Sequence, residues 1–521
     1  MSGARLTVPG LVRRWADEQP DRAFVVTDDD ALTYGELERR SAALAARFAD
    51  LGVGKGTRVG VLMTNGTAWP VVAFGASRAG ATVVPLSTFL RPPELAAQLR
   101  TAGVEHLVLQ GEFLGRDSVA DLMAISPELI AGPRLMVEAV PRLRTISLWD
   151  EPAAALEAPP RPELAAALDA SVRPADDLAI VFTSGSRGTP KGVIHTHGGA
   201  LGATAAGLEV RRLTRDDRLY IPMPFFWVGG FGTGLLSALL AGATLLTEAR
   251  PEAARTLPFL ERNRVTLFRG WPDQAATLAR DPGFAAADLS SLRAGSLDAV
   301  MPTELRAAPG QRAGLLGMTE SFGPYSGYRL DETLPPGKEG SCGQVFDGVE
   351  LRVVDLDSGE PVAAGETGEL QLRGPNLMRG ICGRTRAEVF TDDGFYPTGD
   401  VGHLDADGFL FLTGRRDDMF KVRGATVYPS EVEGALHALP AVRRAFVVDV
   451  VGAGGGAEVA AVVVVSDDAS SEVLVEELAR DAKERLSSFK VPTRWCIVGA
   501  DDVPMTTTGK VDKAGLQQLF D

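Results

Sequence analysis

A loop rich in glycine and hydroxyl residues carries the strongest chemical signal in the chain. It reads Thr183-Ser184-Gly185-Ser186-Arg187-Gly188-Thr189-Pro190-Lys191-Gly192 and directly follows an apolar stretch. In such a loop, backbone N–H groups and hydroxyls can converge on anionic oxygens, and Lys191 adds a positive charge. Pro190 stands where the Walker A spacing requires its second glycine, so this is not a Walker A loop. The order of residues predicts a phosphate site of another type rather than a solvated turn.

Other residues that could take part in catalysis or bind a metal form less specific patterns. The run His197-Gly198-Gly199-Ala200 is similar to an esterase oxyanion loop, but the chain contains no G-x-S-x-G elbow. His195 and His197 have no acidic or cysteine neighbour at ligand spacing, which disfavours a metal site. Asp405 and Asp407 flank a glycine and are more typical of a turn than of an acid–base pair.

Composition excludes several classes of protein. The 521 residues suggest about three to four structural units. Lys and Arg number 53 against 68 Asp and Glu, a net charge of −15, which argues against a nucleic-acid or anionic-membrane binder. Three widely spaced cysteines without a CxxC pair exclude a disulfide framework and a cysteine-built zinc site. Reduced thiols and a cytoplasmic location are therefore expected.

One segment without charged residues could, by its length, form a transmembrane helix. Residues 219–247 contain no charged side chain and are long enough to cross a bilayer. Two prolines and five glycines interrupt the segment, and no Lys/Arg asymmetry flanks it. We interpret it as a loop, a buried helix over 233–240 and a strand over 243–247. Arg5, Arg13 and Arg14 break up the first apolar residues, so no export signal is expected either.

The order of the elements predicts an α/β fold. Short β-branched runs alternate with Ala/Leu/Arg-rich stretches, as in proteins with parallel strands. The expected elements are helices over 37–51 and 94–102 and strands over 58–63, 81–85, 106–110 and 178–182. The Ala/Pro-rich stretch 151–177 is expected to be a surface connection with little core of its own.

The pattern changes after about residue 340. Short strands separated by Ser-Gly and Asp-Gly turns predict a small antiparallel β region. The last 100 or so residues predict a compact α+β domain. Its expected elements are helices over 430–439 and 472–486 and strands over 445–450 and 458–465. The charged stretch around Asp417 is the expected domain boundary.

Eight segments in order give the chain a resemblance to the adenylate-forming superfamily, which comprises acyl-CoA ligases, carrier-protein-loading adenylation domains and luciferase-like enzymes. The segments are residues 32–37, 80–86, 183–192, 224–230, 317–320, 396–400, 414–417 and 504–510. The resemblance implies a large N-terminal domain, 1–416, of two packed α/β subdomains plus a small β-barrel-like subdomain. A small, mobile α+β C-terminal domain, 417–521, is expected to follow.

Superfamily members join a carboxylate to the AMP part of ATP, expel pyrophosphate, and pass the acyl group to a thiol. The reacting anions have the same sign, so the site must supply positive charge and oriented donors. Lys510 matches the lysine that contacts the carboxylate and the α-phosphate, Glu320 the Mg²⁺ ligand, and Thr319 a phosphate donor. Trp227 completes the expected catalytic set, at a position where many CoA ligases have His. Asp417 matches the hinge about which the C-terminal domain rotates.

The resemblance implies three further groups of residues. Nucleotide binding is expected from Thr183, Ser184, Gly185, Ser186, Arg187, Gly188, Thr189, Lys191, Gly295, Ser296, Leu316, Gly317, Met318, Thr319, Asp400 and Arg415. Arg423 and Gly424 are expected beside the CoA tunnel, and Phe226, Trp227, Val228, Gly229, Phe231 and Met318 in the acyl pocket.

These roles predict an AMP-forming acid–CoA ligase that uses Mg²⁺, ATP and coenzyme A. The expected pocket is apolar and lacks a basic partner for a second carboxylate, which favours a bulky hydrophobic acid. The run at 428–433 is more similar to CoA ligases than to carrier-loading domains, so free CoA is the expected acceptor. Luciferase-like oxygenation uses the same motifs. A non-catalytic binding protein is disfavoured, because Lys510, Glu320 and Asp400 are all present.

Three departures from the superfamily pattern concern ATP. Arg187 replaces a usual Thr or Ser, Leu316 replaces a tyrosine that stacks on adenine, and the stretch 294–298 replaces a Ser-Gly-Gly-Ala run. An alternative function is therefore that of a ligase that does not adenylate its acid but only transfers the acyl group of an acyl-adenylate (acyl-AMP), supplied by a partner enzyme, to CoA. A carrier-protein-loading enzyme is a second alternative.

Overall fold

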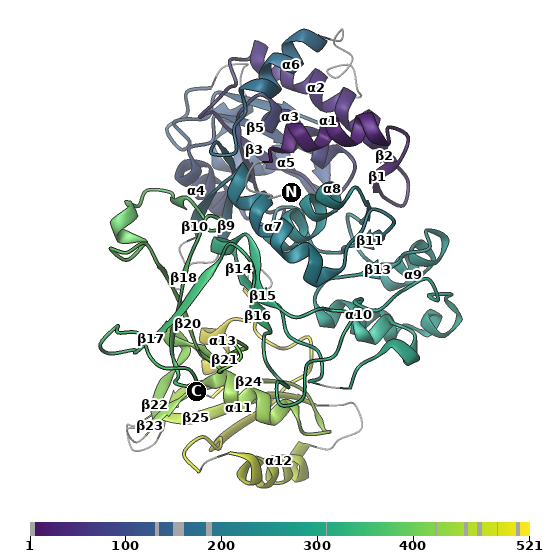
Figure 1. The fold of residues 1–521 in the computed structure, drawn as a ribbon. Coiled ribbons are helices and arrows are strands. Elements are labelled where there is room, and N and C mark those ends of the chain that lie inside the picture. The colour runs from purple at the N-terminus through teal and green to yellow at the C-terminus, as the bar shows by residue number, and fades with distance from the viewer. Residues whose placement is uncertain are drawn as a thin grey trace. The chain divides into compact units, whose positions relative to one another are not determined.

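The computed structural model describes residues 6–130, 135–149, 161–183, 190–308, 310–422, 425–452, 457–465, 471–486, 488–506 and 511–520. The chain divides into two compact units (Figure 1). The first unit comprises Met1–Glu350 and Leu372–Tyr396, and the second comprises Leu351–Gln371 and Pro397–Asp521. The second unit thus contains all of the expected C-terminal domain, and the boundary at residue 417 stays a prediction.

A seven-stranded sheet in the order β19-β10-β9-β4-β3-β5-β8 carries the predicted phosphate loop. Its strands are β3 (Arg58–Leu62), β4 (Thr82–Pro85), β5 (His106–Leu109), β8 (Thr145–Leu148), β9 (Asp177–Thr183), β10 (Lys191–Thr196) and β19 (Gly380–Ile381). The five strands from β9 to β8 pair in parallel, as expected. β10 and β19 are antiparallel additions at one edge, so the sheet is mixed.

A second sheet of the first unit has the order β13-β11-β12-β1-β2. Its strands are β1 (Ala23–Val26), β2 (Ala31–Thr33), β11 (Arg218–Tyr220), β12 (Thr244–Leu246) and β13 (Leu267–Phe268). A third, three-stranded sheet consists of β14 (Leu316–Met318), β15 (Gly323–Gly327) and β16 (Gln344–Val345).

The helices of the first unit follow local sequence signals. They are α1 (Val8–Glu18), α2 (Tyr34–Asp50), α3 (Ala68–Arg78), α4 (Pro92–Ala102), α5 (Ser118–Ile125), α6 (Pro162–Ser171), α7 (His197–Arg211), α8 (Ser237–Ala241), α9 (Ala253–Arg262) and α10 (Pro272–Ala279). α2 begins three residues before the predicted start, because Thr33 and Glu36 cap each other's backbone N–H groups. α3 is buried on all sides, as expected for a helix without a polar face.

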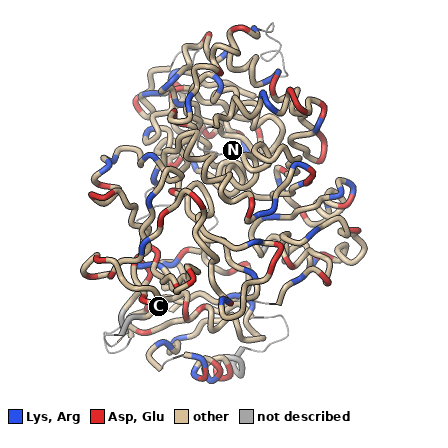
Figure 2. The backbone as a smooth tube through the Cα atoms, in the orientation of Figure 1, with Lys and Arg blue, Asp and Glu red and all other residues tan. Residues whose placement is uncertain are grey.

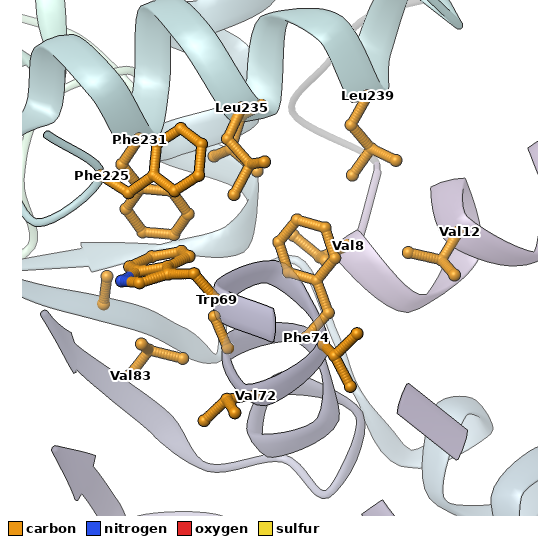
Figure 3. Packing of buried hydrophobic residues seen from close by; sticks show 14 of the residues in the cluster. Val8, Val12, Trp69, Val72, Phe74, Val83, Phe225, Phe231, Leu235 and Leu239 are labelled. Carbon is orange, nitrogen blue, oxygen red and sulfur yellow. The ribbon is translucent and has the colours of Figure 1, made fainter. Parts of the chain in front are cut away.

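The main core of the first unit joins α1 and α3 to the charge-free segment. Figure 3 shows Trp69 and Phe74 of α3 packed near Phe225, Phe231 and Leu235. That segment forms a π-helix, η4 (Gly229–Leu236), then α8 and β12, which confirms the predicted buried helix and strand. In the described part of the chain, no helix is long and apolar enough to cross a membrane.

The prediction of a mere surface connection over 151–177 is wrong for its second half. Residues 162–171 form α6, which begins with proline at its first position and is rich in alanine and leucine. Asp169 of α6 is buried and accepts two hydrogen bonds from Arg78, both of 2.9 Å. A buried ion pair therefore attaches α6 to the core, a contact that composition does not show.

The second unit contains a β region and an α+β region. A four-stranded sheet that lies mostly in this unit has the order β17-β18-β20-β21. Its β20 and β21 pair antiparallel, as the predicted small β region requires. Its strands are β17 (Glu350–Val354), β18 (Gly368–Arg373), β20 (Tyr396–Leu404) and β21 (Leu410–Arg415). The expected C-terminal helices and strands are α11 (Pro429–His437), α12 (Ser471–Arg485), β24 (Val442–Val451) and β25 (Ala457–Val465). The short β22 (Phe420–Val422), β23 (Ala425–Val427), β26 (Arg494–Ile497) and α13 (Lys513–Gln518) were not predicted.

Charges are distributed along the whole chain. Figure 2 shows Lys and Arg interspersed with Asp and Glu in both units, without a continuous basic stretch among the described residues. This distribution agrees with the net negative charge of the chain.

Candidate active site

The predicted phosphate loop connects two antiparallel strands of the seven-stranded sheet. Thr183 at the end of β9 lies opposite Lys191 at the start of β10. Ser184, Gly185, Ser186, Arg187, Gly188 and Thr189 lie outside the described residues. The Lys191 side chain is half-buried and has no hydrogen-bond or ion-pair partner in the described part of the chain. Its positive charge is thus available to an anionic ligand.

The Thr319–Glu320 pair lies in a tight turn between β14 and β15. Ser321 organises this turn, because its hydroxyl accepts a hydrogen bond from the Met318 N–H at 3.2 Å and donates to the Gly323 carbonyl at 2.7 Å. The Phe322 N–H donates to the Thr319 carbonyl at 3.0 Å and closes a short 3₁₀ helix, η8 (Thr319–Ser321). A side chain at Gly317 would meet the Gly323 carbonyl oxygen at 2.4 Å, so only glycine fits there.

Glu320 is a buried carboxylate held in one orientation. Its side chain is buried, and the Tyr396 hydroxyl donates to its Oε1 atom at 3.1 Å. The Met378 N–H fixes its backbone carbonyl at 2.8 Å. Within the described ranges, no hydrogen bond reaches the Oε2 atom of Glu320 or the hydroxyl of the half-buried Thr319. One carboxylate oxygen and one hydroxyl are thus free for a ligand.

This donor set fits a nucleotide-bound Mg²⁺. Mg²⁺ in nucleotide sites is held by one or two carboxylates together with substrate phosphates and water, not by a protein cage. Among the described residues, no group of three or more His, Cys, Asp or Glu side chains could hold a metal ion alone. Glu320 would be the protein ligand, and the remaining ligands would come from the nucleotide and water.

The stretch at 294–298 ends near β13. The Ser296 hydroxyl accepts a hydrogen bond from the Phe268 N–H at 3.1 Å, and Ser296 is buried. Gly295 has φ +95°, a conformation that favours glycine. Leu316 is half-buried in β14, opposite Ser326. The structure therefore gives Gly295 and Ser296 roles in the backbone path of this stretch, apart from any contact with a nucleotide.

The predicted acyl segment forms an aromatic cluster. Phe226 and Val228 are buried, whereas the Trp227 ring is partly exposed. The ring centroid of Trp227 lies 5.2 Å from that of Phe226 and 5.6 Å from that of Trp271, a residue that was not predicted from the sequence. Phe89, also not predicted, lies 5.7 Å from Phe226 and 6.0 Å from Trp227. Periodicity gives no signal for such pairs, because the three segments meet only in the fold.

Glycines shape the turn into η4. A side chain at Gly230 would meet the Pro224 carbonyl oxygen at 2.1 Å, and one at Gly229 would meet Met223 Sδ at 2.7 Å. The next aromatic residue, Phe231, is buried with its ring centroid 5.7 Å from that of Phe322. The structure therefore brings the acyl segment and the Thr319–Glu320 turn together.

Two predicted nucleotide residues face each other in the second unit. Asp400 on β20 pairs with Arg415 on β21, and Arg415 donates to the buried Asp400 carboxylate at 2.8 Å. Burial alone would lower the pKa of Arg415, but the Asp400 carboxylate raises it overall. Gly399, with φ +74°, leaves room for the guanidinium.

The predicted hinge residue, Asp417, is exposed in a short turn, η10 (Arg416–Asp418). The neighbouring Asp418 forms a 2.8 Å ion pair with Lys513. Arg423, Gly424 and Lys510 lie outside the described residues.

His195 on β10 and His197 at the start of α7 both belong to the core. Burial lowers the pKa of His195 to about 3 and that of His197 to about 4. His197 Nδ1 accepts a hydrogen bond from the Val8 N–H at 3.3 Å, and the His195 ring lies 4.8 Å from that of Phe322. Both rings are thus neutral at neutral pH.

Family models and related sequences both match nearly the whole chain to AMP-binding enzymes and acyl-CoA ligases. Residues 12–382 match the AMP-binding enzyme family, and residues 431–510 match the AMP-binding enzyme C-terminal domain. A 3-[(3aS,4S,7aS)-7a-methyl-1,5-dioxo-octahydro-1H-inden-4-yl]propanoyl:CoA ligase of Mycobacterium tuberculosis is 33% identical, covering 98% of this chain and 99% of that protein. A feruloyl-CoA synthase of an Amycolatopsis species is also 33% identical, covering 98% of each.

A solved structure shows the same fold. The crystal structure of the anthranilate CoA ligase AuaEII in complex with anthranoyl-AMP has a TM-score of 0.81. It is 24% identical and covers 99% of this chain and 98% of that one. Mixed α/β architecture with a large N-terminal and a small C-terminal part is thus confirmed. The chain belongs to the AMP-binding enzyme family, in the AMP-forming acyl-CoA ligase branch of the adenylate-forming superfamily.

Proposed function

We propose that this chain activates a bulky hydrophobic carboxylic acid with ATP and transfers the acyl group to free CoA. The observation that supports this most directly is the contact between the two halves of the candidate site. The buried, oriented Glu320 carboxylate lies in the turn that Phe322 closes, and Phe322 packs on Phe231 of the acyl segment. A carboxylic acid seated among the aromatic rings would thus lie near the phosphate-handling residues.

In the first half-reaction, the acid's carboxylate attacks the α-phosphate of ATP, the bond to pyrophosphate breaks, and an acyl-adenylate forms. Thr319 and the phosphate loop would donate hydrogen bonds to phosphate oxygens, and Lys191 would offset their charge. Lys510 would contact both anions. Mg²⁺ at Glu320 would neutralise charge on the departing pyrophosphate. Asp400 and Arg415 would bind the ribose.

In the second half-reaction, the CoA thiol attacks the acyl carbonyl, and AMP leaves. Rotation of the C-terminal domain about Asp417 would withdraw Lys510 and bring Arg423 and Gly424 to the thiol tunnel. Such a rotation is a hinge motion, in which a few residues absorb the change in backbone angles. The exposure of Asp417 in a short turn supports this assignment. Three free cysteines support the proposal of a cytoplasmic location.

The acid is proposed to be bulky and apolar. Phe226, Val228 and Phe231 are buried, and Trp227 adds a large ring. The relatives named above act on a ring-fused propanoate and on ferulate, which agrees with this class. A panel of free acids, with ATP, Mg²⁺ and CoA, read by mass detection of the acyl-CoA, tests the proposal. We expect thioesters of ring-bearing acids and little product from acetate, whereas preference for short or dicarboxylic acids would contradict it.

The two half-reactions can be separated. Lys510→Ala should lower adenylation by about 10²–10³-fold, as for the loss of one oriented charge, and spare thioester formation from supplied acyl-adenylate. Asp417→Pro should slow overall turnover more than either half-reaction measured alone. An equal loss in both half-reactions of Lys510→Ala would contradict the two-pose mechanism.

One observation favours a second candidate function, a ligase that only thioesterifies an acyl-adenylate supplied by a partner enzyme. Leu316, half-buried in β14, offers no ring for adenine, a loss on the order of 1 kcal/mol in binding. ATP–pyrophosphate exchange with the preferred acid decides between the two. Robust exchange excludes the second candidate. Turnover of synthetic acyl-adenylate with CoA but no exchange supports it, and transfer to a carrier protein rather than CoA would indicate a carrier-loading enzyme.

A further inference from the structure

Phe322 has a backbone conformation that is unusual for a buried aromatic residue. Its φ angle is +54°, in the left-handed region, which is costly for residues with a side chain. The other described non-glycine residues with positive φ are Leu114, Arg212 and Arg264, and all three are exposed. Only 2% of Phe322 is exposed. Backbone strain of this kind persists when the surroundings determine the conformation, and it is concentrated at functional sites.

The Phe322 ring lies where three predicted site segments meet. It packs edge-on against His195, which lies on β10 four residues after Lys191, at 4.8 Å between centroids. It also packs against Phe231 of the acyl segment at 5.7 Å. A side chain at Gly232 would lie 3.1 Å from the edge of the Phe322 ring, so the ring is seated directly on the π-helix.

The contacts continue into the core of the first unit. Phe231 lies 5.2 Å from the fully buried Trp69 of α3 (Figure 3). π-Helical segments such as η4 are rare in proteins, and those that occur are often found at functional sites. The ring of Phe322 is therefore fixed from two sides, and its backbone N–H is the donor that closes the Thr319–Glu320 turn.

We propose that Phe322 is a positioning residue: it sets the Thr319–Glu320 turn against the acyl segment and the strand that follows the phosphate loop. The proposal rests on the role of Glu320 as the Mg²⁺ ligand given above. Because Phe322 closes the turn and its ring touches the other two segments, a shift of the π-helix moves the turn. Phe322 itself contacts no substrate in this proposal, and it acts through the position of the Glu320 carboxylate.

A matched pair of glycine substitutions tests this coupling. Gly232→Ala places a methyl group 3.1 Å from the Phe322 ring and 3.2 Å from the Phe322 carbonyl oxygen, both closer than ordinary contact, so Phe322 must move. Gly234→Ala, on the same π-helix, meets Ile221 at 3.4 Å, which is ordinary contact. We expect Gly232→Ala to lower ATP–pyrophosphate exchange about tenfold and to raise the Mg²⁺ concentration for half-maximal exchange, since small displacements of positioned groups are costly. Gly234→Ala should behave as wild type, and both should form thioester from supplied acyl-adenylate at unchanged rates.

Phe322→Leu provides the second test, with Phe74→Leu in the same core as its control. Both lose a buried ring and are expected to lower the melting temperature. Only Phe322→Leu should raise the Mg²⁺ requirement. It should also reduce the further effect of Gly232→Ala, because the ring that the methyl group displaces is gone and only the backbone carbonyl of residue 322 remains near the methyl group. Calorimetric binding of Mg²⁺·ATP gives the same comparison without turnover.

The outcomes separate this inference from the proposed function. If Glu320→Gln raises the Mg²⁺ requirement but Phe322→Leu and Gly232→Ala do not, the positioning role is refuted and the proposed site stands. Equal effects of Gly232→Ala and Gly234→Ala refute it as well. If Glu320→Gln leaves the Mg²⁺ requirement unchanged, the role of Glu320 fails, and the positioning role fails with it.

Discussion

Two fully buried histidines, His195 and His197, should make the stability of the first unit sensitive to mild acid. Burial lowers the pKa of His195 from its ordinary value of 6.5 to about 3, and that of His197 to about 4. Between these values and 6.5, the unfolded chain binds more protons than the folded chain does. The free energy of unfolding therefore rises with pH across this interval and falls as the solution is acidified from pH 7.

The loss of unfolding free energy is calculated from the difference between the pH and the imidazole pKa of the unfolded chain. At pH 5, each imidazole of the unfolded chain is about 1.5 pH units below its pKa, and each unit corresponds to about 1.36 kcal/mol. Each histidine should thus remove about 2 kcal/mol from the free energy of unfolding, or about 4 kcal/mol for both. A loss of this size is a large part of the stability of an ordinary domain.

Tryptophan fluorescence in urea provides the assay, because five of the six tryptophans, at positions 15, 69, 149, 227 and 271, lie in the first unit. Unfolding is measured at pH 7, 6 and 5 for the wild type and for His197→Gln, whose amide can still accept the Val8 hydrogen bond. The variant should lose about 2 kcal/mol less than wild type between pH 7 and pH 5. His403→Gln, in the second unit, is the control and should not change this difference. Equal acid sensitivity of wild type and His197→Gln would refute the reasoning.

Three further predictions concern the ion pair, the acyl segment and the metal. Arg78→Ala removes both hydrogen bonds from the buried Asp169 carboxylate and leaves it the partly exposed Arg13, at 3.3 Å, as an ion-pair partner; it should lower the free energy of unfolding by about 3 kcal/mol. Arg161→Ala, which breaks an exposed pair, should cost less than about 1 kcal/mol, and urea unfolding compares the two variants. Gly230→Ala forces a methyl group onto a backbone oxygen and should reduce acyl-CoA formation or folded yield, while Gly54→Ala, which meets no atom within 4 Å, should match wild type. Removal of Mg²⁺ with EDTA should abolish ATP–pyrophosphate exchange and leave thioester formation from supplied acyl-adenylate intact, which product mass measurement will show.

Local patterns were sufficient for most elements of the fold. The strand at 58–62 and the helix at 92–102 follow the predicted ranges closely. Both are indicated by the spacing of hydrophobic residues and by helix-capping residues, which are local features of the sequence. The helix at 162–171 was missed, because its Ala/Pro-rich composition resembles a linker and its anchor is a distant arginine. β10 pairs antiparallel with the strand before it, β9. Its neighbour on the other side, β19, lies far along the chain, and no local pattern identifies that pairing.

The candidate site was predictable as separate motifs but not as an arrangement. The pair Thr319–Glu320 was found by its motif, and the structure adds that Tyr396, a member of another motif, holds the carboxylate. Trp271 and Phe89 lie outside every motif, and only the tertiary fold places their rings near Trp227.

The packing of the acyl segment has a consequence for how this enzyme chooses its acid. If the acyl pocket did not contact the Thr319–Glu320 turn, substitutions in the pocket would change only the affinity for the acid. Here Phe231 belongs to the expected acyl wall and also touches Phe322, which closes the turn of Glu320. Binding energy from the acid's tail can therefore act on the position of groups needed only in the transition state, which is the way in which remote contacts raise turnover rather than affinity. On this reasoning, poor acids should differ from good acids more in the rate of adenylation than in their affinity for the pocket, and substitutions at Phe231 should change both properties together.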